Sequence, residues 1–240
     1  MKYYLTIISL LILGSCEKEL TPFELKDKTI YDAIDNLKFG CKDIAVEYYF
    51  KGTIDNKAVC YGDYTNDPKT GEYYGVSYFS NIFYGTSLDI SNYKGKQITF
   101  NFRKDLSFCK DDLIHSLEIQ TPLFQKDSLT TYSKIIDSLF NVGDLKIRTL
   151  AQRDKNENFN ISISLDIKKS LKYPVDASTT LSASSGTQKS SSFFKCNEKK
   201  KIDKNTFKLK FDINCDLFIA INGKFYGNLV GEMVYLIRTD

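Results

Sequence analysis

Residues 159–167 read FNISISLDI, in which apolar and polar side chains alternate without a break. A period of two is that of a β-strand, whereas a helix would repeat its apolar positions every three to four residues. A strand of this kind has one dry and one wet face, as in an antiparallel sheet with one side packed on a core. The stretch therefore predicts a fold built from antiparallel strands.

The same alternation recurs in several other segments of the chain. Two turn signals accompany them: Asp55-Asn56, and Asn222-Gly223, which favours a two-residue type I′ hairpin. We predict a mainly β protein, an antiparallel β-sandwich that forms a single domain over residues 42–240. The alternating segments are 44–50, 97–103 and 207–215, and a long strand is expected over 224–237 after the Asn222-Gly223 turn.

Two short helices and one long loop interrupt this strand pattern. Thr21-Pro22-Phe23-Glu24 has the form of a capping box, and the apolar spacing that follows predicts a possible N-terminal helix within 22–39, with a flexible tether as the alternative. An apolar stripe over 129–140 predicts one short crossover helix packed on the sheet. The Ser/Thr-rich segment near 176–192 has little apolar content, so we expect a long loop there.

The N-terminus has the parts of a secretory signal. Lys2 precedes a short apolar run, which is too short to span a bilayer of ~30 Å. Leu13-Gly14-Ser15-Cys16 resembles a bacterial lipobox, which implies a lipoprotein signal peptide over 1–15, a lipidated Cys16 and an outer-membrane location. Residues 16–41 would then form the lipidated tether and the short helix. The alternative is an ordinary signal peptide with a chance cysteine.

The acidic residues after Cys16 resemble the export signal of surface lipoproteins, so we expect the anchored protein to face outward; a solvated tether is the alternative. Lys and Arg number 33 against 30 Asp and Glu, which predicts no nucleic-acid partner. We also interpret the Lys199-Lys200-Lys201 run as a solvated hairpin tip.

Metal, cofactor and catalytic signatures are absent from the sequence. A single His argues against His-rich zinc sites, and none of the cysteines has metal-type spacing. After Cys16 an odd number of cysteines remains, so at least one is unpaired and the disulfide connectivity stays open. We therefore predict no metal, no cofactor and no enzymatic activity. The cysteines in question are Cys41, Cys60, Cys109, Cys196 and Cys215.

One aromatic segment, residues 71–85, is a candidate binding loop. It combines Tyr and Phe with Ser, Gly and Asn, the residue types that adaptable binding surfaces favour, and aromatic rings suit stacking on sugars or peptides. The alternative interpretation is a set of cross-strand aromatic pairs in an ordinary sheet. The candidate residues are Tyr73, Tyr74, Tyr78, Phe79, Phe83 and Tyr84.

Cys16, the segment Phe50–Lys57 and the segment Ile221–Gly227 together resemble small β-sandwich lipoproteins of Bacteroidota-type bacteria, a group largely of unknown function. The resemblance implies a fold and an address but no catalytic residues. Three hypotheses follow. The first is a non-enzymatic binding or accessory module at the cell surface, with a glycan or an envelope protein as its partner. The second is a structural or assembly lipoprotein that docks through a sheet edge, and the third is a carbohydrate-active hydrolase.

Overall fold

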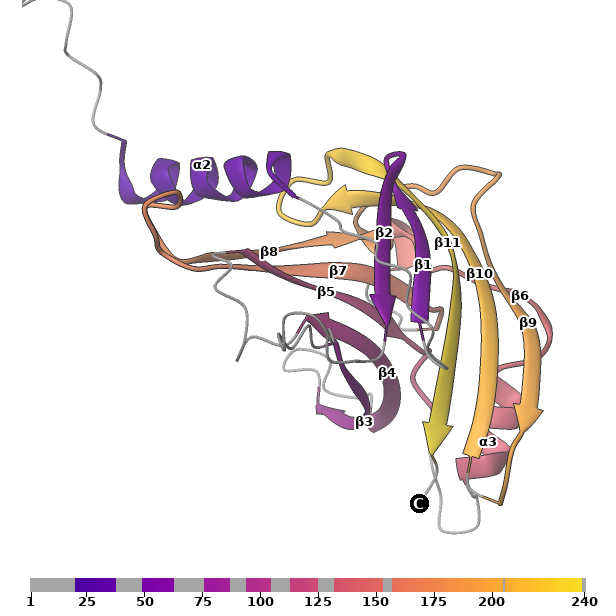
Figure 1. Ribbon diagram of the computed structural model, residues 1–240. Helices are drawn as coiled ribbons and strands as arrows, with labels where there is room; N and C mark the ends of the chain where they lie inside the picture. The colour runs from indigo at the N-terminus through magenta and orange to yellow at the C-terminus, as the bar shows by residue number, and fades with distance from the viewer. Residues whose placement is uncertain are drawn as a thin grey trace, which may run out of the picture.

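The strands form one antiparallel sheet that curls over on itself like half a barrel (Figure 1). This computed structural model describes residues 20–37, 49–62, 76–86, 94–104, 113–124, 132–152, 157–204 and 206–238. The prediction of a mainly β, antiparallel fold is confirmed. The predicted signal peptide, Cys16, Tyr73, Tyr74, Cys41 and Cys109 lie outside the described residues.

Within the described residues the sheet contains eleven strands, in the order β2-β1-β11-β10-β8-β7-β5-β4-β3, with β9 beside β10 and β6 beside β9. Strand β10 is the branch point: its residues Phe207–Asn214 pair with β9, whereas Phe218 and Ile219 pair with β8. The strands are β1 Tyr49–Ile54, β2 Lys57–Gly62, β3 Val76–Thr86, β4 Lys94–Lys104, β5 Leu113–Gln120, β6 Gly143–Leu145, β7 Asn160–Ile167, β8 Ala177–Ser182, β9 Phe193–Lys201, β10 Thr206–Ile219 and β11 Phe225–Arg238.

The core lies between the two halves of this curled sheet. The Tyr235 ring of β11 meets Phe100 of β4 at 4.5 Å and Phe102 at 5.3 Å between ring centroids. The alternating apolar residues of β7 are buried on the same side. The two packed layers of the predicted sandwich are therefore halves of one continuous sheet, which turns over at β10.

Both predicted helices are present. Helix α2, Pro22–Asp35, starts with the predicted capping box: Thr21 N–H donates to Glu24 Oε2 (2.9 Å), and Glu24 N–H donates to Thr21 Oγ1 (3.2 Å). Its apolar stripe packs on the core. Helix α3, Tyr132–Leu139, crosses between β5 and β6, and Phe140 behind it packs against Phe100. No helix in the described part is long and apolar enough to cross a membrane.

The Ser/Thr-rich segment is not a long loop, so that prediction was wrong. It contains β8 and the buried 3₁₀ turn η2, Ala183–Ser185. Its hydroxyl groups find partners on the sheet, because Ser182 Oγ donates to Asn160 Oδ1 (3.0 Å) and also contacts Ser184 Oγ. Small hydroxylated side chains with satisfied hydrogen bonds can be buried in a sheet without apolar bulk.

Both predicted turns are present, but only the first is a two-residue type I′ hairpin. Asp55 and Asn56 both have positive φ, 47° and 61°, and form the two-residue type I′ hairpin between β1 and β2. At the other turn only Gly223 has a positive φ, and the N–H groups of both Asn222 and Gly223 donate to the carbonyl of Ile219. The β10–β11 turn is therefore longer than the predicted type I′ hairpin.

Candidate functional site

From Val76 onward the predicted binding loop is a strand, which corrects the expectation of a loop. Strand β3 pairs along its whole length with β4, and the register puts Tyr78 opposite Phe102 and Phe79 opposite Asn101. Phe83 and Tyr84 pair with Gln97 and Lys96 in the same ladder. The run is rich in aromatic and β-branched residues, which favour strands over loops. Cross-strand pairing, the alternative interpretation, describes this part of the segment.

Strand β3 ends the strand order on one side, and its composition is unusual for that place. Its 11 residues, VSYFSNIFYGT, contain neither a charged residue nor a proline. Proteins usually blunt such edges with Lys, Pro or short length, because an exposed edge offers a row of backbone donors and acceptors to another chain. The strand at the other end of the order, β2, has only 6 residues and begins with Lys57. The arrangement is suited to adding an extended strand from a partner.

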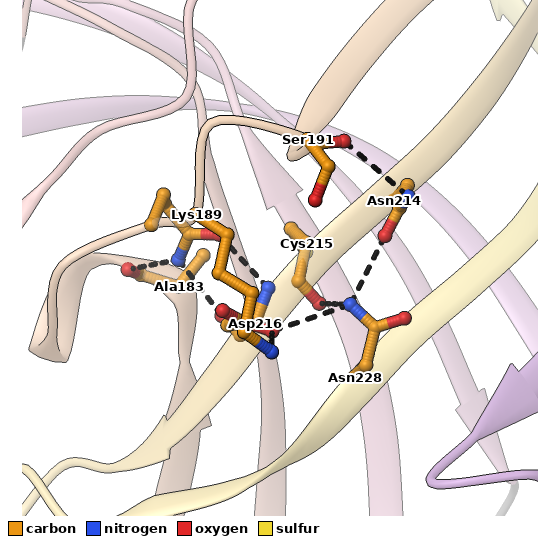
Figure 2. A network of polar contacts seen from close by, with 8 residues as sticks. Ala183, Lys189, Ser191, Asn214, Cys215, Asp216 and Asn228 are labelled. Atoms are coloured by element: carbon orange, nitrogen blue, oxygen red, sulfur yellow. Dashed lines mark hydrogen bonds and ion pairs between the residues drawn. The ribbon is translucent and has the colours of Figure 1, made fainter.

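A buried polar network joins β10, β11 and the segment before β9 (Figure 2). The Asp216 carboxylate, 2% exposed, accepts from Lys189 Nζ (3.0 Å) and Asn228 Nδ2 (3.3 Å). The Gln188 side chain bonds both backbone groups of Asp216 at 2.8 Å. The network lies beside the register shift of β10 at Leu217/Phe218 and therefore fixes the strand where it changes partners. All these groups are engaged with one another, which indicates a structural role.

A second polar cluster lies on the outer face of the sheet. Tyr49 Oη and Lys210 Nζ both donate to the Glu232 carboxylate, the latter at 2.5 Å. The bonds from Lys210 and Tyr49 hold the pKa of Glu232 below its ordinary value, and the bond to Glu232 raises the pKa of Tyr49. The cluster connects β1, β10 and β11 and is partly exposed.

The single histidine lies at the seam where β2 faces β5. Tyr61 Oη and His115 Nδ1 are 2.6 Å apart, and the two rings meet edge to face. Burial raises the pKa of Tyr61, so its phenol stays protonated. The His115 tautomer decides which of the two groups donates. The pair links β2 to β5 across the curled sheet.

The described cysteines differ in their bonding state. Cys60 is disulfide-bonded, whereas Cys196 and Cys215 are free and buried. Burial raises the pKa of both free thiols, so neither is a ready nucleophile. Among the residues that the structure describes, no group of His, Cys, Asp and Glu is placed to hold a metal ion.

The sequence alone missed the Asp216 network, although an aspartate in the otherwise apolar end of β10, CDLFI, is a usable signal. Comparisons with protein-family models, curated proteins and solved structures find no match to this chain. The candidate site therefore depends on geometry and composition, which point to the edge of β3.

Proposed function

We propose that this chain is a lipoprotein anchored to the outer membrane through Cys16, and that it acts at the cell surface as a non-enzymatic binding module. Its binding surface is the edge of β3. The observation that carries the proposal is the uncharged, proline-free strand of 11 residues at the end of the sheet. The lipobox-like segment 13–16 supports the anchor.

The chemistry of a sheet edge selects the partner. Backbone N–H and C=O groups repeat along a strand with the spacing of another polypeptide strand, and main-chain hydrogen bonds supply the affinity. A glycan has no amide groups at that spacing. The partner is therefore an envelope protein that contributes an extended segment, rather than a sugar.

Site-specific crosslinking tests the edge. The photo-reactive amino acid p-benzoylphenylalanine is placed at Phe79 of β3 in the full chain, expressed in its own cells. We expect one discrete adduct with an envelope protein, and we expect Phe83→Lys to abolish it by putting a charge on the edge. Val230 is the matched control position, since it is 41% exposed on β11, in the middle of the sheet. Equal adducts at Phe79 and Val230 would exclude the edge as the site.

The anchor has its own test. Cys16→Ala should abolish incorporation of an alkyne-labelled fatty acid and move the protein from the membrane fraction to the soluble fraction. Labelling that persists in the variant would refute the lipid anchor.

A role as a structural or assembly lipoprotein is the second candidate, because the same edge suits a docking partner inside the envelope. Protease added to intact cells separates the two: digestion supports a surface module, and protection supports assembly on the inner side.

A further inference from the structure

Lysines crowd the turn between β9 and β10. Residues 199–208 read KKKIDKNTFK, five lysines and one aspartate, in a chain whose total charge is near balance. The hairpin closes through a bond from Ile202 N–H to Thr206 O (2.9 Å). We call Lys200, Lys201, Lys204 and Lys208 the basic turn. The first three are exposed and Lys208 is half-buried.

The basic turn lacks the charge compensation seen elsewhere in the protein. Lys199 pairs with Asp137 of α3 at 3.0 Å, and Lys210 pairs with Glu232. Within the described residues none of the four lysines of the basic turn forms an ion pair. Lys201 instead lies over the Phe207 ring, at 5.5 Å from its centroid.

The register adds an unfavourable pair. Lys200 of β9 lies directly opposite Lys208 of β10. Like charges in facing positions destabilise a sheet, so this arrangement costs stability. An external anion that binds beside both ammonium groups would relieve this repulsion, and the relief would add to its affinity.

We propose that the basic turn binds an acidic polysaccharide through its carboxylate or sulfate groups. Four lysines and no arginine suit charges spread along a polymer, since Arg is the residue that recognises a single phosphate or carboxylate bidentately. Helix α2 and the basic turn lie at opposite ends of the molecule (Figure 1). An anchor at Cys16 would hold the start of α2 within about 20 Å of the membrane, which leaves the basic turn at the end of the molecule remote from the anchor; this last step rests on the proposed anchor.

The test uses the full protein, purified from membranes in a zwitterionic detergent. Its binding is measured on three immobilised polymers: polygalacturonate, dextran sulfate and neutral dextran. The buffer contains 50 mM NaCl, at which charges are screened over roughly 14 Å. We expect binding to at least one of the acidic polymers, none to neutral dextran, and loss of binding as salt is raised. The double variant Lys200→Gln/Lys208→Gln should weaken binding about tenfold.

The matched control is Lys168→Gln/Lys169→Gln, which removes the same charge from exposed residues after β7; it should change affinity less than about twofold. An equal loss in both variants would reduce the effect to net charge and overturn the proposal. So would failure to bind either acidic polymer. Thermal unfolding of Lys200→Gln/Lys208→Gln should show unchanged or higher stability, and a loss of stability would indicate a structural role instead.

Discussion

Gly52 of β1 and Gly231 of β11 lie opposite each other, and neither position has room for a side chain. A Cβ on Gly52 would lie 2.0 Å from the Val230 carbonyl oxygen, and one on Gly231 would lie 2.6 Å from the Phe50 ring. The two glycines thus allow close approach of the strands where the sheet curls around Phe50. They explain why a long strand such as β11 contains glycines in its interior.

The first prediction concerns this pair. Gly52→Ala should lower the free energy of unfolding by about 3 kcal/mol, because the obstructing atoms belong to the backbone and the strands must separate. Urea unfolding measures the effect. Thr53→Ala, at the next residue of the same strand, should cost less than about 1 kcal/mol. Similar losses in the two variants would contradict the proposed close approach.

A second prediction concerns the buried carboxylate of Asp216. Asp216→Ala removes an acceptor from Asn228 Nδ2 and Lys189 Nζ. It should cost about 2 kcal/mol of unfolding free energy, because Asp216 is buried whereas the Lys189 side chain is 61% exposed and stays hydrated. Asp212→Ala is the matched control, four residues earlier on the same face of β10 and only half-buried, and should cost less than about 0.5 kcal/mol. Both variants are measured by denaturant unfolding. Equal losses of unfolding free energy would show that the buried Asp216 network contributes no more than an ordinary surface aspartate.

The strands and helices could be predicted because their signals are local. The alternation over 159–167 and the capping box at Thr21 act within a few residues, and both survive in the fold. Strand β8 could not be predicted, since its burial depends on hydrogen bonds between Ser182 and the distant Asn160. The geometry of the β10–β11 turn was not predicted either, since Asn222-Gly223 indicated a two-residue hairpin and the observed turn is longer.

The site was harder to predict for the same reason. The sequence marked Phe79 and Phe83 as candidates, but their place on a terminal strand depends on the pairing of β4 with β5 and of β5 with β7. Tyr49 and Glu232 are 183 residues apart, and only the pairing of β1 with β11 brings them together. Long-range pairing, rather than local preference, decides these features.

A third prediction concerns pH. Because Lys210 and Tyr49 hold the pKa of Glu232 below its ordinary 4.5, the carboxylate stabilises the fold above that pH, and this stability is lost as pH falls through the lowered folded-state pKa. The side chain is 36% exposed, so the contribution at neutral pH should stay below about 1 kcal/mol.

The Glu232→Gln variant tests this contribution against the natural chain. The difference in unfolding free energy between the two should be constant near neutral pH and should shrink below pH 4.5, because the natural chain then loses the same interaction. Lys210→Met should also shrink the difference. A difference that is independent of pH down to full protonation would contradict the assignment.

The last prediction concerns Arg148, which is only 6% exposed. Its Nη2 donates to the Asn158 carbonyl at 3.1 Å, but its Nε has no hydrogen-bond partner among the described residues. Burial lowers the pKa of the guanidinium, so the charged side chain is held at a cost. Arg148→Met keeps the apolar stem and removes the charge, and should raise the free energy of unfolding by about 1 kcal/mol.

Arg148→Ala separates charge from packing, since it removes the stem as well and should lower the free energy of unfolding by about 2 kcal/mol. Both variants are compared by urea unfolding at neutral pH. If Arg148→Met is as unstable as Arg148→Ala, the bond from Nη2 to Asn158 contributes more than the buried charge costs. The guanidinium would then be a net stabiliser of the segment that joins β6 to β7.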